Sequence, residues 1–148
     1  MALECAAKVE ECDSYQMPLV EGDAPDGLAP GQAARATLHE LDWRPLVAAL
    51  LADRARGEST ARIAARFHQA LVDGALAVAR LAGESRGGAV TQVALSGGCF
   101  QNLLLSENLA AALRAADFTV LVHRAVPAND GGIALGQIAV AAARLAAH

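Results

Sequence analysis

Two short loops of the sequence carry residue types that hold phosphate groups in proteins. The first, Ser96-Gly97-Gly98, directly follows an apolar segment typical of a buried strand, and Asn102 comes four residues later. Glycine leaves the backbone N–H groups bare, and the helix expected next adds a partial positive charge, so a phosphate or ribose could bind there. Asn102 could reach back to a sugar or phosphate oxygen. A tight turn without any ligand explains the glycines equally well, and both interpretations stay open.

The second loop, Asp130-Gly131-Gly132, stands at the expected start of the last helix. Aspartate is among the favoured residues for capping a helix N-terminus, and this role by itself accounts for Asp130. Alternatively, the carboxylate holds a divalent metal ion that in turn binds phosphate. The pattern favours the cap, although one carboxylate can serve both roles.

The other residues with catalytic potential are predicted to be structural. His68 lies within a helical pattern and is expected to be packed or partly exposed rather than a ligand, and Cys99 is expected to be a small buried hydrophobic residue. His123 ends a strand near Asp130, which makes it more interesting, yet a lone imidazole there is still expected to be structural. No Ser-His-Asp order, pair of catalytic carboxylates or Cys/His metal cluster can be assembled from the sequence.

The apolar patterns around the two loops predict alternating strands and helices. Strands are expected over 92–95 and 118–123, and helices over about 101–115 and 131–146. Apolar strands separated by helices lie parallel in a sheet that the helices cover. Ligands bind at the carboxyl ends of such strands, where both glycine loops stand.

The first half of the chain is predicted to add helices and two short strands. The expected helices span 2–11, 43–55 and 59–82, the strands 15–20 and 37–41, and a Gly-, Pro- and Asp-rich loop 21–31. Asp42 is the expected cap of the second helix and Gly57 its stop, while Ser59 or Thr60 caps the third. Gly74 inside that helix costs about 1 kcal/mol relative to alanine, which indicates close packing against a neighbour.

Composition limits the possible classes of protein. The chain has 148 residues, enough for a single domain, with 54% hydrophobic but only 3% aromatic residues. A net charge of −4 without a basic stripe argues against nucleic acid as a partner. The apolar tracts are shorter than the ~20 residues that span a membrane, and no signal pattern opens the chain. The three cysteines form no pattern typical of a disulfide framework, and together these observations predict a cytoplasmic protein.

Several stretches of the sequence resemble the hydrogenase-maturation carbamoyltransferases, the HypF family. "VALSGGCFQNLLL" at 93–105 and "VPANDGGIALGQ" at 126–137 resemble that family's C-terminal signature. "LDWRPLVAALL" at 41–51, "IAARFHQAL" at 63–71 and the opening "MALE" resemble it in the same order. The resemblance implies one lobe of an actin-like ATPase (ribonuclease H-like) fold. That lobe is an α/β structure with a mixed sheet covered by helices, similar to the tRNA threonylcarbamoyltransferases.

The resemblance also implies an activity for the full-length protein. In this family carbamoyl phosphate and ATP yield carbamoyl adenylate. The C-terminal domain then passes the carbamoyl group to the C-terminal cysteine of a HypE-like partner, which leads to the cyanide ligand of [NiFe]-hydrogenase. The predicted nucleotide-binding residues are Ser96, Gly97, Gly98, Asn102, Gly131 and Gly132, and the predicted ligand of a divalent metal is Asp130.

The sequence departs from the family pattern in what it lacks. The family's histidine metal ligands lie in a preceding lobe, so we expect residues 1–148 to be a truncated C-terminal lobe that is inactive without the missing N-terminal part. The alternative is a non-catalytic docking module of the same fold, and a third interpretation is a flavodoxin-like domain that binds ligand unaided. The face that meets the missing lobe could also drive dimerisation.

Overall fold

The computed structural model describes residues 13–22, 38–85 and 90–146. The helix predicted over 2–11 and most of the loop predicted over 21–31 lie outside these residues. Contacts divide the chain into two compact units, Met1–Leu81 and Ala82–His148, and each is described by itself. That residues 1–148 act as a single domain stays a prediction.

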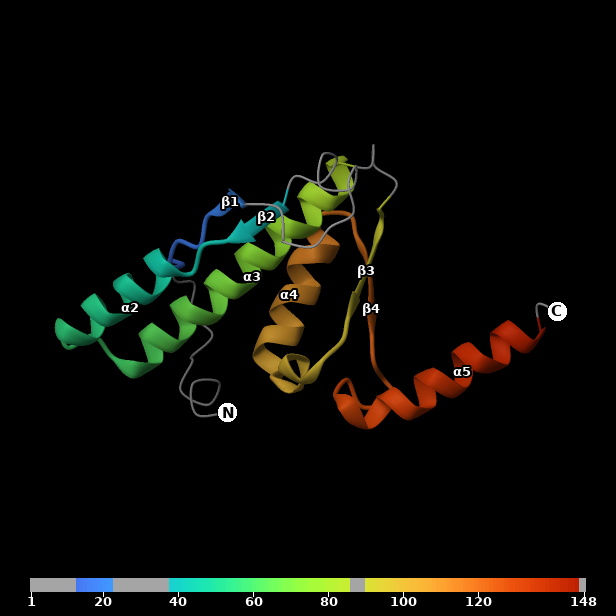
Figure 1. Cartoon of the computed structure of the whole chain (residues 1–148). Helices are drawn as coiled ribbons and strands as arrows, with labels where there is room; N and C mark the ends of the chain where they lie inside the picture. The colour runs from blue at the N-terminus through green and yellow to red at the C-terminus, as the bar shows by residue number, and fades with distance from the viewer. Residues whose placement is uncertain (1–12, 23–37, 86–89, 147–148) are drawn as a thin grey trace. The chain divides into compact units, whose positions relative to one another are not determined.

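The first unit combines an antiparallel strand pair with two helices (Figure 1). In chain order its elements are β1 (Leu19–Gly22), β2 (Leu38–Leu41), α2 (Arg44–Ala55) and α3 (Thr60–Ser85). Leu19 pairs with Leu41 at one end of the β1–β2 ladder and Gly22 with Leu38 at the other. All four elements were expected, but β1 begins only after Pro18, because proline has no N–H to donate to a ladder.

The ends of the two helices agree in part with the ends predicted from the sequence. The prediction that Asp42 is the cap of α2 was wrong by one residue, since Trp43 occupies that position. Asp42 nevertheless accepts a hydrogen bond from the Arg44 backbone N–H at 3.0 Å. Gly57, with a φ of +78°, ends α2 as expected. At the start of α3, the Ser59 hydroxyl accepts from the Arg62 N–H at 3.3 Å, which confirms Ser59 as its cap.

The core of the first unit packs the helices against the segment before β1. Tyr15, Leu46 and Ala70 are buried there, with partly buried Met17, Ala49, Leu50 and Phe67 around them. A Cβ on Gly74 would lie 2.4 Å from the Met17 Cε atom and 3.3 Å from Leu41 Cδ1. The close packing predicted at Gly74 is therefore confirmed.

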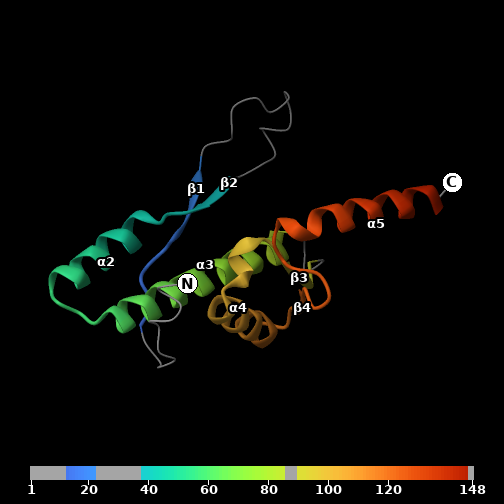
Figure 2. The ribbon, with the colours of Figure 1, turned by 90° about the horizontal axis from the view of Figure 1, so that it is seen from below.

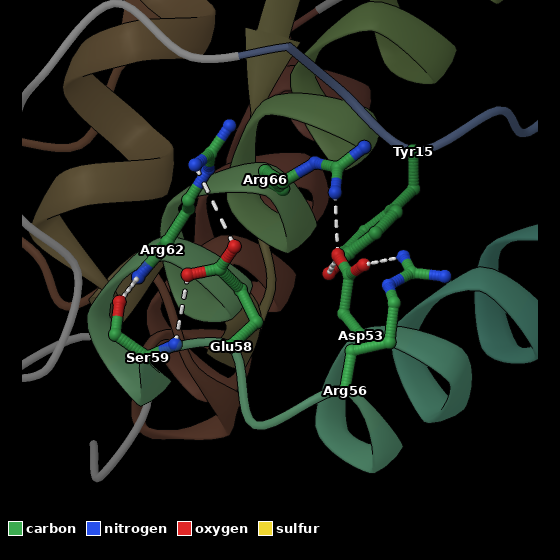
Figure 3. Close-up of polar contacts among 7 residues, drawn as sticks. All are labelled: Tyr15, Asp53, Arg56, Glu58, Ser59, Arg62 and Arg66. Atoms are coloured by element: carbon green, nitrogen blue, oxygen red, sulfur yellow. Dashed lines mark hydrogen bonds and ion pairs between the residues drawn. The ribbon is translucent and has the colours of Figure 1, made fainter.

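A buried carboxylate ties this core together (Figure 3). Asp53 on α2 is 3% exposed, and its Oδ2 accepts a hydrogen bond from the Tyr15 hydroxyl at 2.7 Å. Arg56 and Arg66 bind the same carboxylate, and the Arg66 guanidinium lies 4.4 Å from the centre of the Tyr15 ring. The Tyr15 hydrogen bond and the two arginines lower the pKa of Asp53, whereas burial and the bond to Asp53 raise the pKa of Tyr15 to about 12.

The second unit holds a parallel strand pair and two helices. Its elements are β3 (Gln92–Leu95), the 3-10 turn η2 (Gly98–Gln101), α4 (Leu103–Ala115), β4 (Thr119–Val122), the 3-10 turn η3 (Asp130–Gly132) and α5 (Ile133–Ala146). Strands β3 and β4 lie side by side in both views (Figure 1, Figure 2) and pair in parallel, with Leu95 opposite Val122. The predicted order of elements and the parallel pairing are confirmed.

The two helices of this unit differ in how much surface they bury. Helix α4 contacts β4 and buries Leu109, Ala110 and Leu113. Helix α5 is exposed along its whole length, although it is almost entirely apolar. Within the described parts of the chain, no helix is long and apolar enough to cross a lipid bilayer.

The Asp53 cluster predicts how stability depends on pH. The pKa of Asp53 is lower in the folded chain than the ~3.9 of an unfolded aspartate, so the unfolded chain takes up this proton first as the pH falls. The contribution of Asp53 to the free energy of unfolding is therefore fully present at pH 7 and is lost below about pH 4.

Urea denaturation at different pH values tests this role. Between pH 7 and pH 3, the free energy of unfolding should fall less in Asp53→Asn than in wild type. The control Asp73→Asn, at an exposed position of α3, should keep the wild-type slope, and equal slopes for all three chains would contradict this role.

Candidate functional site

The parallel pairing brings the two predicted loops to the same edge of the sheet. Leu95 and Val122 are partners at the last positions of β3 and β4, so the following residues leave the sheet together. The Gly97 N–H donates to the Ala128 carbonyl at 2.7 Å. The chain segment of the first loop is thereby fixed to the segment that leads into Asp130.

The two glycines of the first loop differ in whether the structure requires glycine at their positions. Gly97 has a φ of +106° and a ψ of 161°, a conformation that side chains other than glycine rarely adopt. Gly98 has no such φ, and a Cβ placed on it would meet nothing within 4 Å. Neither the backbone nor packing requires glycine at position 98. The backbone there faces open space, which is what a ligand that lies against it needs.

The glycines of the second loop are explained by packing inside the loop. A Cβ on Gly132 would lie 2.9 Å from the Pro127 carbonyl oxygen and 3.0 Å from Val126 Cγ1. A Cβ on Gly131 would lie 3.1 Å from the Asn129 side-chain oxygen. Gly132 thus leaves no room for a side chain, whereas at Gly131 the Asn129 side chain would have to shift by a few tenths of an ångström. The contact of both glycines with a nucleotide stays a prediction.

The prediction that Asp130 caps the last helix was wrong. Asn129 takes the cap position before η3, and its Oδ1 accepts from the Gly131 N–H at 3.1 Å. Asp130 is the first residue of η3, and its exposed side chain makes no hydrogen bond or ion pair with the described residues. Asparagine and aspartate cap equally well, and the neighbouring asparagine occupies the position.

A complete metal site is not formed by the residues that the structure describes. Among them no group of three or more His, Cys, Asp or Glu side chains is placed to hold an ion. Asp130 offers one carboxylate, whereas hard divalent cations take several oxygen ligands. The described residues therefore do not fit a metal by themselves.

The start of α4 differs from the prediction in a way that affects the first loop. The helix begins at Leu103 rather than at about Gln101, and η2, which starts at Gly98, precedes it. Asn102 caps α4, because its Oδ1 accepts from the Leu105 N–H at 2.9 Å. The side-chain oxygen of Asn102 thus has a structural role, and its contact with a nucleotide stays a prediction.

Cys99 and the histidines complete the comparison with the predicted roles. Cys99 is exposed, so its prediction as a buried residue was wrong; it lies on η2 and not in the core. Of the two alternatives predicted for His68, the packed one is confirmed: the residue is 3% exposed, with its Nδ1 2.8 Å from the Ala64 carbonyl. His123 has a partner that the sequence did not indicate: its Nε2 lies 3.0 Å from the Ser96 hydroxyl, 27 residues away in the chain.

Comparison with known proteins assigns the chain to a family. Residues 1–137 match the family model described as "Carbamoyltransferase, Kae1-like Domain, second subdomain". The chain belongs to this carbamoyltransferase family. The HypF resemblance predicted from the sequence is thereby confirmed.

Individual relatives agree with that assignment. The chain is 40% identical over 99 residues to carbamoyltransferase HypF of Synechocystis sp., which covers 66% of this chain and 12% of the relative. It is 46% identical over 104 residues to carbamoyltransferase HypF2 of Cupriavidus necator, which covers 70% and 12%. A crystal structure of full-length HypF in the phosphate- and nucleotide-bound form matches with a TM-score of 0.76 and 29% identity, over 91% of this chain and 16% of that one. The structural match confirms the predicted α/β, actin-like lobe. The described strands, however, form two separate pairs, antiparallel β1–β2 and parallel β3–β4, and not the single mixed sheet that was expected.

The different surroundings of Gly98 and Gly132 predict opposite effects on stability. Gly132→Ala should lower the free energy of unfolding by about 1–3 kcal/mol, because its methyl group meets the Pro127 carbonyl. Gly98→Ala should change it by less than ~0.5 kcal/mol, since the added methyl group meets no atom. Urea denaturation followed by circular dichroism measures both. Equal destabilisation by the two substitutions would contradict the open surroundings of Gly98.

Proposed function

We propose that this chain is the part of a HypF-type carbamoyltransferase that binds the phosphate of the nucleotide. The observation that carries the proposal is the backbone of Gly98, which is open although neither conformation nor packing calls for glycine. The full-length HypF that this chain resembles was solved with phosphate and nucleotide bound. A glycine backbone at the carboxyl ends of parallel strands suits such a ligand.

The proposed reaction is transfer of a carbamoyl group from carbamoyl adenylate, made from carbamoyl phosphate and ATP, to a thiolate. A sulfur–carbon bond forms on the C-terminal cysteine of a HypE-like acceptor, and the bond between carbamoyl carbon and phosphate oxygen breaks to release AMP. The phosphate of AMP gains negative charge in this step. The Gly98 backbone N–H and the Ser96 hydroxyl would donate hydrogen bonds to it, which stabilises the leaving group. No step is assigned to a metal ion.

The proposal assigns the rest of the chemistry to parts of the enzyme outside this chain. The chain spans only 12% of the length of the two HypF relatives named above. We expect it to be inactive by itself and to work in the cytoplasm, in the pathway that supplies the cyanide ligand of [NiFe]-hydrogenase.

The exposed apolar surface of helix α5 supports the proposal that a partner binds this lobe. Ile133, Leu135, Ile138 and Leu145 are each more than half exposed, and a helix that is apolar on all sides is normally buried. We propose that the N-terminal remainder of the enzyme covers α5. A second copy of this chain could bind the same face when that remainder is absent. The same exposed helix favours the alternative function, a docking module without catalysis.

Nucleotide binding tests the first part of the proposal. The chain should bind ATP in a calorimetric titration, and Gly98→Val should weaken binding at least tenfold, because the side chain fills the space beside the backbone. The thermal midpoint should stay unchanged. Gly136→Ala is the matched control, since a Cβ there also meets nothing within 4 Å but the residue lies on α5. Full affinity in Gly98→Val would overturn the proposed site.

Reconstitution separates the enzyme lobe from the docking module. Mixing the chain with the N-terminal remainder of a HypF enzyme should restore carbamoyl transfer, and Ile138→Asp should weaken the association at least tenfold by placing a charge in the apolar interface. Leu51→Asp, at a similarly exposed position of α2, is the control that should associate normally. Stable association without transfer would favour the docking module. Association that is unchanged by Ile138→Asp would exclude α5 from the interface.

A further inference from the structure

The hydrogen bond between His123 and Ser96 joins the two loops through side chains. His123 directly follows β4 and Ser96 directly follows β3, and their Nε2 and Oγ atoms are 3.0 Å apart. The backbone bond from Gly97 to Ala128, at 2.7 Å, joins the same two loops. Both side chains are exposed, so the pair lies at the surface beside Gly98 and does not belong to the core.

The position of one proton decides what this pair can bind. If Nε2 of His123 carries no proton, it accepts the hydroxyl proton of Ser96, and that hydroxyl cannot donate to anything else. If Nε2 carries a proton, it donates to the Ser96 oxygen, and the hydroxyl proton can point to a ligand. The oxygens of an ionised phosphate only accept hydrogen bonds. Only the second arrangement therefore lets Ser96 contact a phosphate.

We propose that His123 is a positioning residue of the nucleotide site: its Nε2–H donates to Ser96 Oγ and turns the Ser96 hydroxyl proton towards the phosphate that lies against Gly98. The inference rests on the proposed function and adds a residue that acts through Ser96 without touching the nucleotide. It also requires a proton on Nε2 of the His123 ring when the nucleotide is bound.

The ring nitrogens of His123 report this proton directly. In the full chain labelled with ¹⁵N-histidine, the His123 signals of the ATP-bound chain should show the pattern of a ring protonated at Nε2. The ring of His68 is an internal control, because its Nδ1 already faces the Ala64 carbonyl and its signals should not move. In Ser96→Ala the Nε2 proton of His123 has no acceptor, so the His123 signals should differ from those of the ATP-bound wild type. A His123 ring without a proton on Nε2 in the ATP-bound chain would overturn the inference.

Binding by variants provides a second, independent measurement. His123→Gln keeps an N–H donor near the position of Nε2 and should retain ATP affinity within about twofold, whereas His123→Leu should lose roughly 5- to 10-fold. Ser96→Ala should lose a similar factor, and the double variant Ser96→Ala with His123→Leu should lose no more than either one. Equal losses for Gln and Leu would show a merely structural histidine and overturn the inference.

The outcomes separate this inference from the function on which it rests. Unchanged ATP affinity in His123→Leu, with binding by wild type intact, would overturn only the role of His123. A wild-type chain that binds no ATP would overturn the proposed nucleotide site and the role of His123 together.

Discussion

The parallel pairing of β3 with β4 is the constraint on which the candidate site depends. Its register sets Leu95 beside Val122, so residues far apart in the sequence leave the sheet at one edge. The bonds from Gly97 to Ala128 and from His123 to Ser96 follow from that placement. Because side chains alternate between the faces of a strand, a slip of one residue in this register would separate Ser96 from His123.

Within this frame, the surroundings of each glycine distinguish structure from function better than the glycine pattern does. Gly97 is required by its backbone conformation and Gly132 by the nearby Pro127 carbonyl, and Gly131 lies close to the Asn129 side chain. At Gly98 neither the backbone conformation nor a close neighbour requires glycine. Its open backbone therefore supports ligand binding, and a nucleotide is the ligand to test, because the similar structure of full-length HypF was solved with phosphate and nucleotide bound. The exposed, apolar α5 is a second feature that the described residues leave without a structural explanation.

Local patterns in the sequence predict the elements of this fold well, because periodicity and turn residues act over short distances. The choice between Asn129 and Asp130 as a cap could not be predicted, since both residue types cap well and they stand side by side. Cys99 is exposed because it lies on η2, a turn that no hydrophobic periodicity in the sequence predicts. The Ser96–His123 bond and the buried Asp53 depend on contacts between distant residues, which a pattern along the chain does not contain.

The measurement that tests the central claim most directly is an amide NMR spectrum of the ¹⁵N-labelled chain with increasing ATP. We expect the largest shifts at Gly97 and Gly98 and in the segment 128–131, because the two loops form one site at the strand ends. The β1–β2 pair should not respond. Saturating shifts confined to other residues, or no shifts at all, would contradict a nucleotide site at this edge of the sheet.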